Sequence, residues 1–329
     1  METSLPRVRG LAISARTFRR LAAFSALMLL LVVATGATVR LTASGLGCRH
    51  WPGCQAQQFL PEKGYHSYIE FSNRAVAGVT VFATLLAFVG SLLCPGVRRR
   101  VRWLAGLTFA GTFAQAPLGA ITVHYHLNPW LVLSHFLLSM AVLALGVLVL
   151  LEAWDVSGDV VPTVLRRLSL VVVFAAGLMI VAGTLATAGG PHPGSSSAVR
   201  RLDTFGTAVY WHVRATAVFG VSFALLLVAL YRRHVRQVRF GVAVVAVLLA
   251  QMAVGEVQYR TELPWWLVLG HVTLAACLWA ATVAFTASLW RPTRRRLSVP
   301  ASGRAGFPRV RLRRERPSSE IPASNRIGG

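Results

Sequence analysis

The chain has 329 residues, of which 55% are hydrophobic and only 14% charged, and its 34 Lys and Arg against 11 Asp and Glu give a net charge of +23. Soluble domains carry about 25% charged residues, so this composition and the long apolar runs exclude a soluble globular enzyme and a disordered chain. Four cysteines are too few for a disulfide-rich scaffold.

Eight apolar runs follow one another along the chain, each near the roughly 20 residues that an α-helix needs to cross a bilayer. Helices are expected because a lone strand in lipid leaves its backbone polar groups unpaired. The predicted helices cover residues 19–40, 69–93, 103–123, 129–151, 168–188, 205–230, 240–259 and 264–290. The first run is too long and too poorly flanked for a cleaved signal peptide. The sequence therefore predicts an all-α integral membrane protein.

Arginines mark one side of the predicted bundle. They crowd the N-terminal tail, the connections after the second, fourth and sixth helices, and the C-terminal tail, whereas the other connections hold few. The positive-inside rule therefore predicts both termini in the cytoplasm and a multi-pass protein of the cell membrane. The tail 291–329, rich in Arg, Pro and Ser, is expected to be disordered. We interpret it as a basic anchor near anionic lipid, with no role in nucleic-acid binding.

The chain also repeats itself at a coarse scale. A unit containing Gln, Gly, Pro and His occurs twice, with the same Gln-to-His spacing: Gln115, Gly119, Pro129, His135 and Gln251, Gly255, Pro264, His271. His212 precedes the second unit, and the matching position before the first lies close to Asn73. The pattern predicts two pseudo-symmetric four-helix bundles related as a parallel repeat. The expected parts are a tail 1–18, a half 19–151, a linker 152–167, a half 168–290 and a tail 291–329.

Ionisable residues inside apolar runs are costly and are candidates for function. They are Glu70, Arg74, His135, His212, Arg214, Glu256 and His271, with Arg40 at an edge. His135 lies about 9 Å inside the outer end of its helix, from a rise of about 1.5 Å per residue. His271 reaches a similar depth in the last helix, so the polar groups are expected in the outer part of the bilayer.

Paired histidines on facing helices of a bundle suit haem iron, which takes an imidazole from each side. His212 and His271 form such a pair. The alternative is that each histidine makes an interhelical hydrogen bond. Zinc is disfavoured because it prefers a four-ligand shell that this set does not offer. Arg74 and Arg214 lie near enough to the outer surface to meet haem propionates, or they extend to the interface to stay hydrated.

The order of these residues resembles one family. The stretch from Arg40 through Cys48, Trp51 and Cys54 is similar to the first outer loop of haem A synthases. The segment from Ile69 to Arg74 resembles that family's Glu-x-x-His-Arg motif. The two repeat units, His212 and the loop from Gly183 to His192 follow in family order. The resemblance covers roughly residues 20–290 and leaves only the tails outside.

Members of this family oxidise the C8 methyl of haem O to the formyl group of haem A, through successive hydroxylations and loss of water. The resemblance implies an oxidoreductase with its substrate haem in the N-terminal half and a haem b cofactor in the C-terminal half. His212 and His271 would be the haem b ligands, and His135 a ligand or close neighbour of the substrate iron. Arg40 and Arg214 are candidate propionate contacts.

Glu70 would be the carboxylate nearest the reacting group, in a substrate site shared with Asn73 and Arg74. A carboxylate beside a haem can move protons; the alternative is a partner for Arg74 one turn away. Asn73 stands where many family members have histidine. Asparagine is a poor iron ligand, so an iron held by one protein ligand would keep an open coordination site.

Cysteine and loop histidines allow further expectations. Cys48 and Cys54 lie on the outer side, where disulfides form, and can close a small loop; a redox-active or transiently haem-linked thiol pair is the alternative. Cys94 and Cys277 are expected to be inert apolar residues. The remaining histidines are interpreted as surface residues rather than a copper site: His50, His66, His124, His126 and His192.

The resemblance implies partners as well: a haem O synthase, cytochrome oxidase assembly factors and an electron donor that the sequence does not identify, with room for a homo-oligomer. Two other functions fit the pattern less well. A dihaem b-type electron carrier linked to quinone needs two bis-histidine sites, and Asn73 removes one ligand. A secondary transporter needs helices broken in mid-membrane, whereas Pro129 and Pro264 lie where helices start.

Overall fold

The structure is a computed structural model that describes residues 12–291 apart from 49, 52, 57, 62 and 196–200. The described residues form eight α-helices: α1 (Ala15–Leu41), α2 (Tyr65–Leu93), α3 (Arg99–His124), α4 (Pro129–Ala153), α5 (Thr163–Gly189), α6 (Phe205–Tyr231), α7 (Val238–Arg260) and α8 (Trp265–Leu289). This confirms the eight predicted helices and their order. The tail from residue 292 and residues 1–11 lie outside the described residues, so the disorder of the basic tail stays a prediction.

Local sequence determines where several helices begin. Ser14 caps α1 by accepting a hydrogen bond from the backbone N–H of Thr17, and Asn128 does the same for Trp130 at the start of α4. Pro129 is the first residue of α4, where a missing N–H has no cost. Pro117 lies inside α3, a position that the sequence analysis did not single out. Proline there leaves one helical carbonyl without its usual donor.

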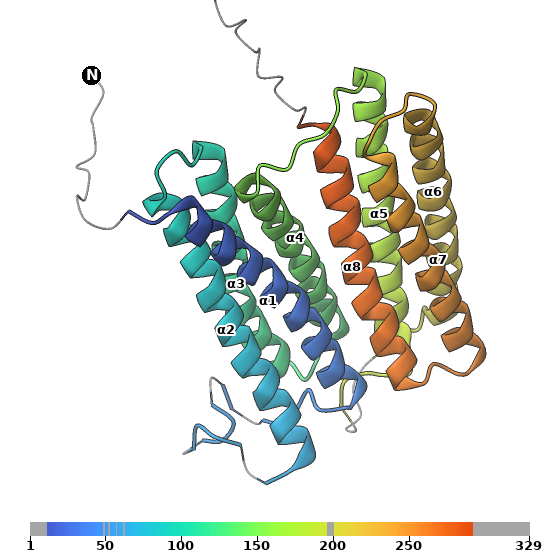
Figure 1. Ribbon diagram of the computed structural model, residues 1–329. Coiled ribbons are helices and arrows are strands. Elements are labelled where there is room, and N and C mark those ends of the chain that lie inside the picture. The colour runs from blue at the N-terminus through green and yellow to red at the C-terminus, as the bar shows by residue number, and fades with distance from the viewer. Residues whose placement is uncertain are drawn as a thin grey trace, which may run out of the picture. The chain divides into compact units, whose positions relative to one another are not determined.

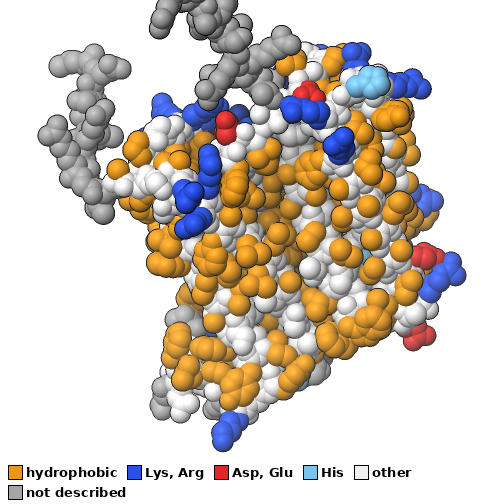
Figure 2. Space-filling view, in the orientation of Figure 1, with side chains coloured by type: hydrophobic (Ala, Val, Ile, Leu, Met, Phe, Trp, Pro, Cys, Tyr) orange, Lys and Arg blue, Asp and Glu red, His pale blue; other side chains and the backbone are white. Residues whose placement is uncertain are grey.

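Each of these helices is long and apolar enough to cross a membrane, with lengths between 23 and 29 residues. Their outward side chains are also apolar: Leu27, Phe174 and Val221 are exposed by 61%, 68% and 61%. Figure 2 shows hydrophobic side chains over most of one face, with most Lys and Arg gathered toward one end. Apolar residues on both inner and outer helix faces are typical of a bundle surrounded by lipid.

We call the end of the bundle where α1 begins and α8 ends the tail end. The opposite end is called the loop end, and it carries the connections 42–64, 125–128, 190–204 and 261–264. Helices α1 to α4 lie together, and α5 to α8 lie beside them (Figure 1). The two groups meet where α1 contacts α8 and where α4 contacts α5 and α8. The indole N–H of Trp279 donates to the Met140 carbonyl across this junction at 2.8 Å.

The described residues belong to one compact unit. Buried side chains from both groups of helices share one apolar cluster that includes Leu29 of α1, Leu143 of α4 and Ala276 of α8. The connection between the groups covers residues 154–162, so it is shorter than the predicted linker 152–167, because α5 begins at Thr163.

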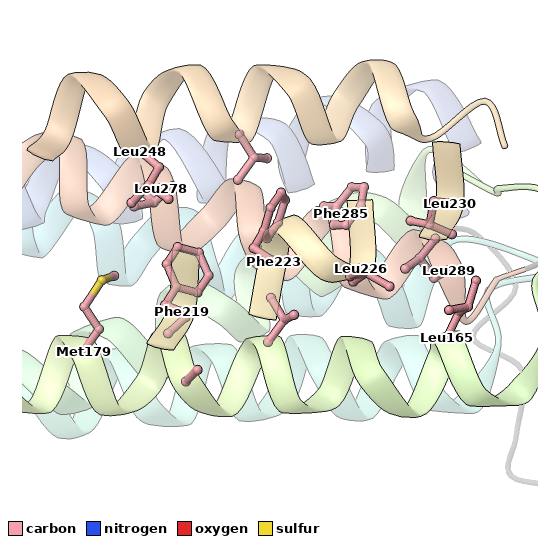
Figure 3. Close-up of a cluster of buried hydrophobic side chains, with 14 of the residues drawn as sticks. Leu165, Met179, Phe219, Phe223, Leu226, Leu230, Leu248, Leu278, Phe285 and Leu289 are labelled. Carbon is pink, nitrogen blue, oxygen red and sulfur yellow. The ribbon is translucent and has the colours of Figure 1, made fainter. Parts of the chain in front are cut away.

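A dense cluster of buried hydrophobic side chains fills the tail-end half of α5 to α8 (Figure 3). Phe223 of α6 packs against Phe285 of α8 with ring centroids 5.2 Å apart. Leu226 and Leu230 complete the packing on α6, and both are fully buried. Because this half is closely packed, the free volume of the bundle lies toward the loop end.

Two ion pairs tie the connections together at the tail end. Arg291, just after α8, pairs with Glu152 near the end of α4 at 3.0 Å, and both side chains are largely buried. Arg236 pairs with Asp159 at 2.9 Å. The backbone N–H of Arg236, and secondarily its guanidinium, lower the pKa of the Asp159 carboxyl. The first pair links the two groups of helices because Glu152 lies in the last turn of α4 and Arg291 follows α8.

Candidate functional site

The polar residues predicted for function, with the exception of Arg214, line one cavity toward the loop end. The cavity has a volume of about 1190 Å³, and its lining includes residues from each of α1 to α8. This exceeds the roughly 300–1,000 Å³ of pockets for a single drug-sized ligand. Among the lining residues are Glu70, Asn73, His135, His212 and His271. The cavity is otherwise mostly apolar, as a site for a large flat ligand with few polar groups requires.

His212 of α6 and His271 of α8 face each other in this cavity. Their ring centroids are 6.3 Å apart, and the rings are inclined at 74°. His212 Nδ1 lies 2.9 Å from the Met179 carbonyl of α5. Since a carbonyl only accepts hydrogen bonds, the His212 ring carries its proton on Nδ1, which leaves Nε2 as a lone-pair donor. His271 Nδ1 is buried without a hydrogen-bond partner among the described residues.

The spacing of this pair fits one metal ion held between two imidazoles. Nitrogen ligands bind transition metals at about 2 Å, so the centres of two rings on opposite sides of one ion stand about 6 Å apart. The observed 6.3 Å agrees with that value. Two neutral imidazoles and an apolar cavity are also what an axially ligated haem requires. The donor set and its geometry therefore fit a haem iron.

Each ring is accommodated by a glycine on the neighbouring helix. A Cβ at Gly183 of α5 would lie 2.8 Å from His212 Cε1, and one at Gly255 of α7 would lie 3.0 Å from His271 Cε1. A side chain at either position would push the imidazole away. The same contact recurs more loosely in the first four helices, where Gly119 faces His135 and Gly36 faces Asn73. The sequence identified Gly119 and Gly255 as members of the repeat and Gly183 as part of a family loop, but it gave none of them a contact with a ring.

Two glutamines make hydrogen bonds within the helix pairs α3–α4 and α7–α8. Gln115 of α3 donates through Nε2 to the His135 carbonyl at 3.1 Å. Gln251 of α7 donates to the His271 carbonyl at 2.9 Å. The sequence analysis identified both glutamines as repeat positions but assigned them no contact. Each bond holds a histidine-bearing helix at a fixed position along its neighbour, so it positions the ring.

Glu70 is 4% exposed and is held by two donors. Its Oε2 accepts from the Cys48 backbone N–H at 2.8 Å, and its Oε1 pairs with Arg74 at 2.5 Å. The sequence left open whether Glu70 serves the cavity or pairs with Arg74. The structure shows the ion pair, and Glu70 also lines the cavity. One carboxylate thus faces the cavity and anchors the loop before α2.

Arg74 extends this anchoring to the loop itself. It donates through Nη1 to the His50 and Gly53 carbonyls at 2.6 and 2.7 Å. Cys48 and Cys54 form a disulfide that closes the same loop. The loop is therefore fixed twice, covalently by the disulfide and to α2 by the Glu70–Arg74 pair.

We expect Cys48 and Cys54 to resist alkylation when membranes are denatured without a reductant, because both sulfurs are in the disulfide. Cys94 and Cys277 are free thiols and provide internal positive controls in the same digest. Mass spectrometry of the peptides measures the labelled fraction of each cysteine. Alkylated Cys48 and Cys54 in freshly isolated membranes would show that the pair is reduced in the cell.

Three predicted loop-end residues differ in their placement. Arg40 lines the cavity and donates to the Thr187 and His192 carbonyls at 2.7 and 2.9 Å. Arg214 is absent from the described cavity lining; it is exposed, and its guanidinium lies over the Tyr210 ring at 3.0 Å. His192, interpreted from the sequence as a surface residue, is instead half-buried in the lining and bonded to the Leu263 carbonyl at 2.8 Å.

The loop that carries His192 also joins the two groups of helices. The backbone N–H of Gly45 donates to the Gly194 carbonyl at 2.7 Å. Arg40 and His192 add side-chain bonds between α1, the end of α5 and the connection before α8. These partners are far apart in sequence, so no local pattern indicated them.

The sequence of this chain is similar to those of known proteins of one family. The family model described as COX15-CtaA, cytochrome oxidase assembly protein, matches residues 19–191. The haem A synthase of Geobacillus thermodenitrificans is 26% identical over 307 residues, which cover 88% of this chain and 96% of that protein. The haem A synthase of Bacillus pumilus is 35% identical over 143 residues, 41% of this chain and 45% of its own length.

The haem A synthase of Lysinibacillus sphaericus is 36% identical over 126 residues, 37% of this chain and 41% of its own length. The family match extends over more than half of the chain, from α1 to the loop after α5, and so includes Glu70, His135 and the disulfide loop. The resemblance inferred from motif order is therefore confirmed, and the chain belongs to the COX15-CtaA family of cytochrome oxidase assembly proteins.

Proposed function

We propose that this protein is a haem A synthase, an oxidoreductase that converts the C8 methyl of haem O to the formyl of haem A. The observation that carries the proposal is the loop-end cavity that brings together two facing imidazoles, a third histidine and a buried carboxylate. Relatives that bear this name align along the chain, one of them over 96% of its own length.

The two groups of helices are proposed to be pseudo-symmetric halves of a parallel repeat. The support is that Gly36, Gly119, Gly183 and Gly255 each face a histidine or Asn73 across a helix pair. The paired bonds of Gln115 and Gln251 add to it. We place the tail end in the cytoplasm because arginines gather there, as the positive-inside rule requires. Both termini then lie on the cytoplasmic side of the cell membrane that the eight helices cross.

The C-terminal half is proposed to bind haem b through His212 and His271. When bound, haem b supplies a one-electron redox centre. The Met179 carbonyl fixes the His212 ring so that Nε2 faces the cavity. Gly183 and Gly255 leave room for the two rings, whose planes are inclined at 74°. The protein's own contribution here is therefore to hold two neutral imidazoles at a fixed separation.

The N-terminal half is proposed to bind haem O as substrate. His135 of α4 is the proposed iron ligand, and Glu70, Asn73 and Arg74 line the same region of the cavity. A carboxylate there can take up protons as the methyl group is oxidised. Arg40 donates hydrogen bonds to carbonyls through Nε and Nη2, and Nη1 is proposed to bind a propionate. Arg214 is not part of the proposed site, because the described cavity lining does not include it.

This function implies partners on either side of the reaction. A haem O synthase supplies the substrate, cytochrome oxidase assembly consumes the product, and an electron donor must exchange with the bound haem. Because haem O carries a long apolar tail, its transfer through the lipid bilayer or directly between membrane proteins is expected. The lipid-facing surface of the bundle leaves room for a homo-oligomer.

We expect cells that make haem O but lack haem A to produce haem A when they express this full-length chain with a haem O synthase. Chromatography of the extracted haems measures the conversion. The matched control is the same strain carrying the empty vector, which should show haem O alone. Unchanged haem O in cells whose membranes contain the folded, haem-loaded protein would contradict the proposed function.

A further inference from the structure

Asn73 occupies in the first four helices the place that His212 occupies in the last four. Gly36 of α1 faces Asn73 of α2, and Gly183 of α5 faces His212 of α6. Four residues before these glycines stand Val32 and Met179. The Met179 carbonyl holds the His212 ring, so the Val32 carbonyl is its counterpart beside Asn73.

Thr35 fills the space between that carbonyl and Asn73. Its hydroxyl donates to Asn73 Oδ1 at 2.7 Å and lies 3.3 Å from the Val32 carbonyl. A hydroxyl has one proton, and the shorter contact with Asn73 is the better hydrogen bond. The residue in the place of Thr35 in α5 is Ala182, which has no hydroxyl. Thr35 and Asn73 therefore act as a pair where the other half uses one histidine.

The bond from Thr35 fixes the direction of the Asn73 amide. With Oδ1 turned toward α1, the amide nitrogen Nδ2 is on the other branch of the side chain, and Asn73 lines the cavity. Among the described residues, no protein acceptor binds Nδ2. A primary amide that keeps its two N–H groups available at an apolar cavity is an oriented hydrogen-bond donor.

We propose that the substrate haem is ligated by His135 alone and that Asn73 Nδ2 donates a hydrogen bond to a small molecule bound at the open sixth position of its iron. This deepens the proposed function and depends on it for the haem in the N-terminal half. Donors and polarity on the open side of a haem decide which small ligands it binds. Thr35 is the positioning residue, because it acts only through the orientation of Asn73.

Carbon monoxide is the probe that tests this arrangement. Full-length protein is loaded with haem O, reduced and exposed to CO. We expect CO to bind the haem O iron and leave the bis-histidine haem b unchanged. Asn73→His should supply the missing second imidazole, convert that haem to a low-spin form and abolish CO binding. Asn73→Leu should keep CO binding but raise the C–O stretching frequency, because the N–H donor is lost.

Thr35→Val releases the amide, so we expect its C–O band to broaden and move toward that of Asn73→Leu. Thr216→Val is the matched control: Thr216 lines the cavity from α6, and its hydroxyl donates to the His212 carbonyl. It should leave the band at the wild-type frequency.

The possible failures can be told apart. If wild-type protein binds haem O and forms haem A in cells but its haem O binds no CO, the open position is wrong and the proposed function stands. If Asn73→Leu leaves the frequency unchanged or lowers it, the amide is not a donor. If wild-type protein binds no haem O and forms no haem A, the proposed function itself fails, and this inference fails with it.

Discussion

His271→Ala is expected to remove the low-spin haem b from the purified full-length protein, and His212→Ala is expected to do the same. The centroids of the two rings are 6.3 Å apart, and each ring supplies one of the two bonds that this site offers to an iron. Alanine supplies no iron ligand in place of the imidazole that it removes. Optical and EPR spectra measure the low-spin signal, and pigment extraction measures haem per protein.

His124→Ala is the matched control for these variants. His124 ends α3 at the loop end and is exposed, so its loss should leave the low-spin signal at the wild-type level. A low-spin signal that persists in the His212→Ala, His271→Ala double variant would rule out this pair as the haem b ligands.

Glu70→Gln is expected to lower haem A formation by at least about 100-fold, in the range that a positioned proton-transfer group contributes. Glutamine keeps the shape and can still accept from the Cys48 N–H, but it cannot take up a proton from the substrate. Haem b ligation should be unaffected, and a partly oxidised haem should accumulate. Chromatography of haems from cells that co-express a haem O synthase gives the measurement.

Arg74→Gln separates proton transfer from anchoring of the loop. It breaks the same ion pair as Glu70→Gln but keeps the carboxylate and its bond to Cys48. If Glu70 transfers protons, Arg74→Gln retains more activity than Glu70→Gln. Equal losses in both variants, or haem A at the wild-type level in Glu70→Gln, would mean that Glu70 serves only as the partner of Arg74.

Two further substitutions compare the proposed substrate ligand with its neighbour. His135→Ala should abolish haem A formation because it removes the proposed bond to the substrate iron. Asn73→Ala should lose less activity, since an asparagine is not expected to hold the iron. Both side chains line the same cavity, so a simple change of cavity volume does not predict this difference.

The sequence by itself determined the eight helices, because the requirement behind them is local. A run that must satisfy its backbone polar groups in lipid can only be a helix, and its length is set by the bilayer. Proline sharpened one boundary: α4 begins at Pro129, as expected. The duplicated Gln and His positions likewise indicated which residues belong together, and they do line one cavity.

Only the tertiary structure decided which faces of these helices meet. The helices are apolar on their lipid-facing and core-facing sides alike, so hydrophobic periodicity carries little information about rotation around each axis. Gly36 and Gly183 were therefore not recognised as the partners of Asn73 and His212, nor was the bond from Thr35 to Asn73. These contacts join different helices and depend on rotation, tilt and depth together.

The same reason explains why His192 departed from its prediction and why the sequence left two alternatives open for Arg214. Sequence position placed both near the outer surface, but whether a side chain there points into the cavity depends on how the loop or helix packs. His192 is held in the cavity lining by the Leu263 carbonyl, which lies in a connection far along the chain. Arg214 is exposed and lies over the ring of Tyr210, which does line the cavity. Composition and spacing thus specified the membrane bundle and its histidines. The arrangement of the site was decided by packing between distant segments, because only that packing brings polar groups to partners that lie far away in the sequence.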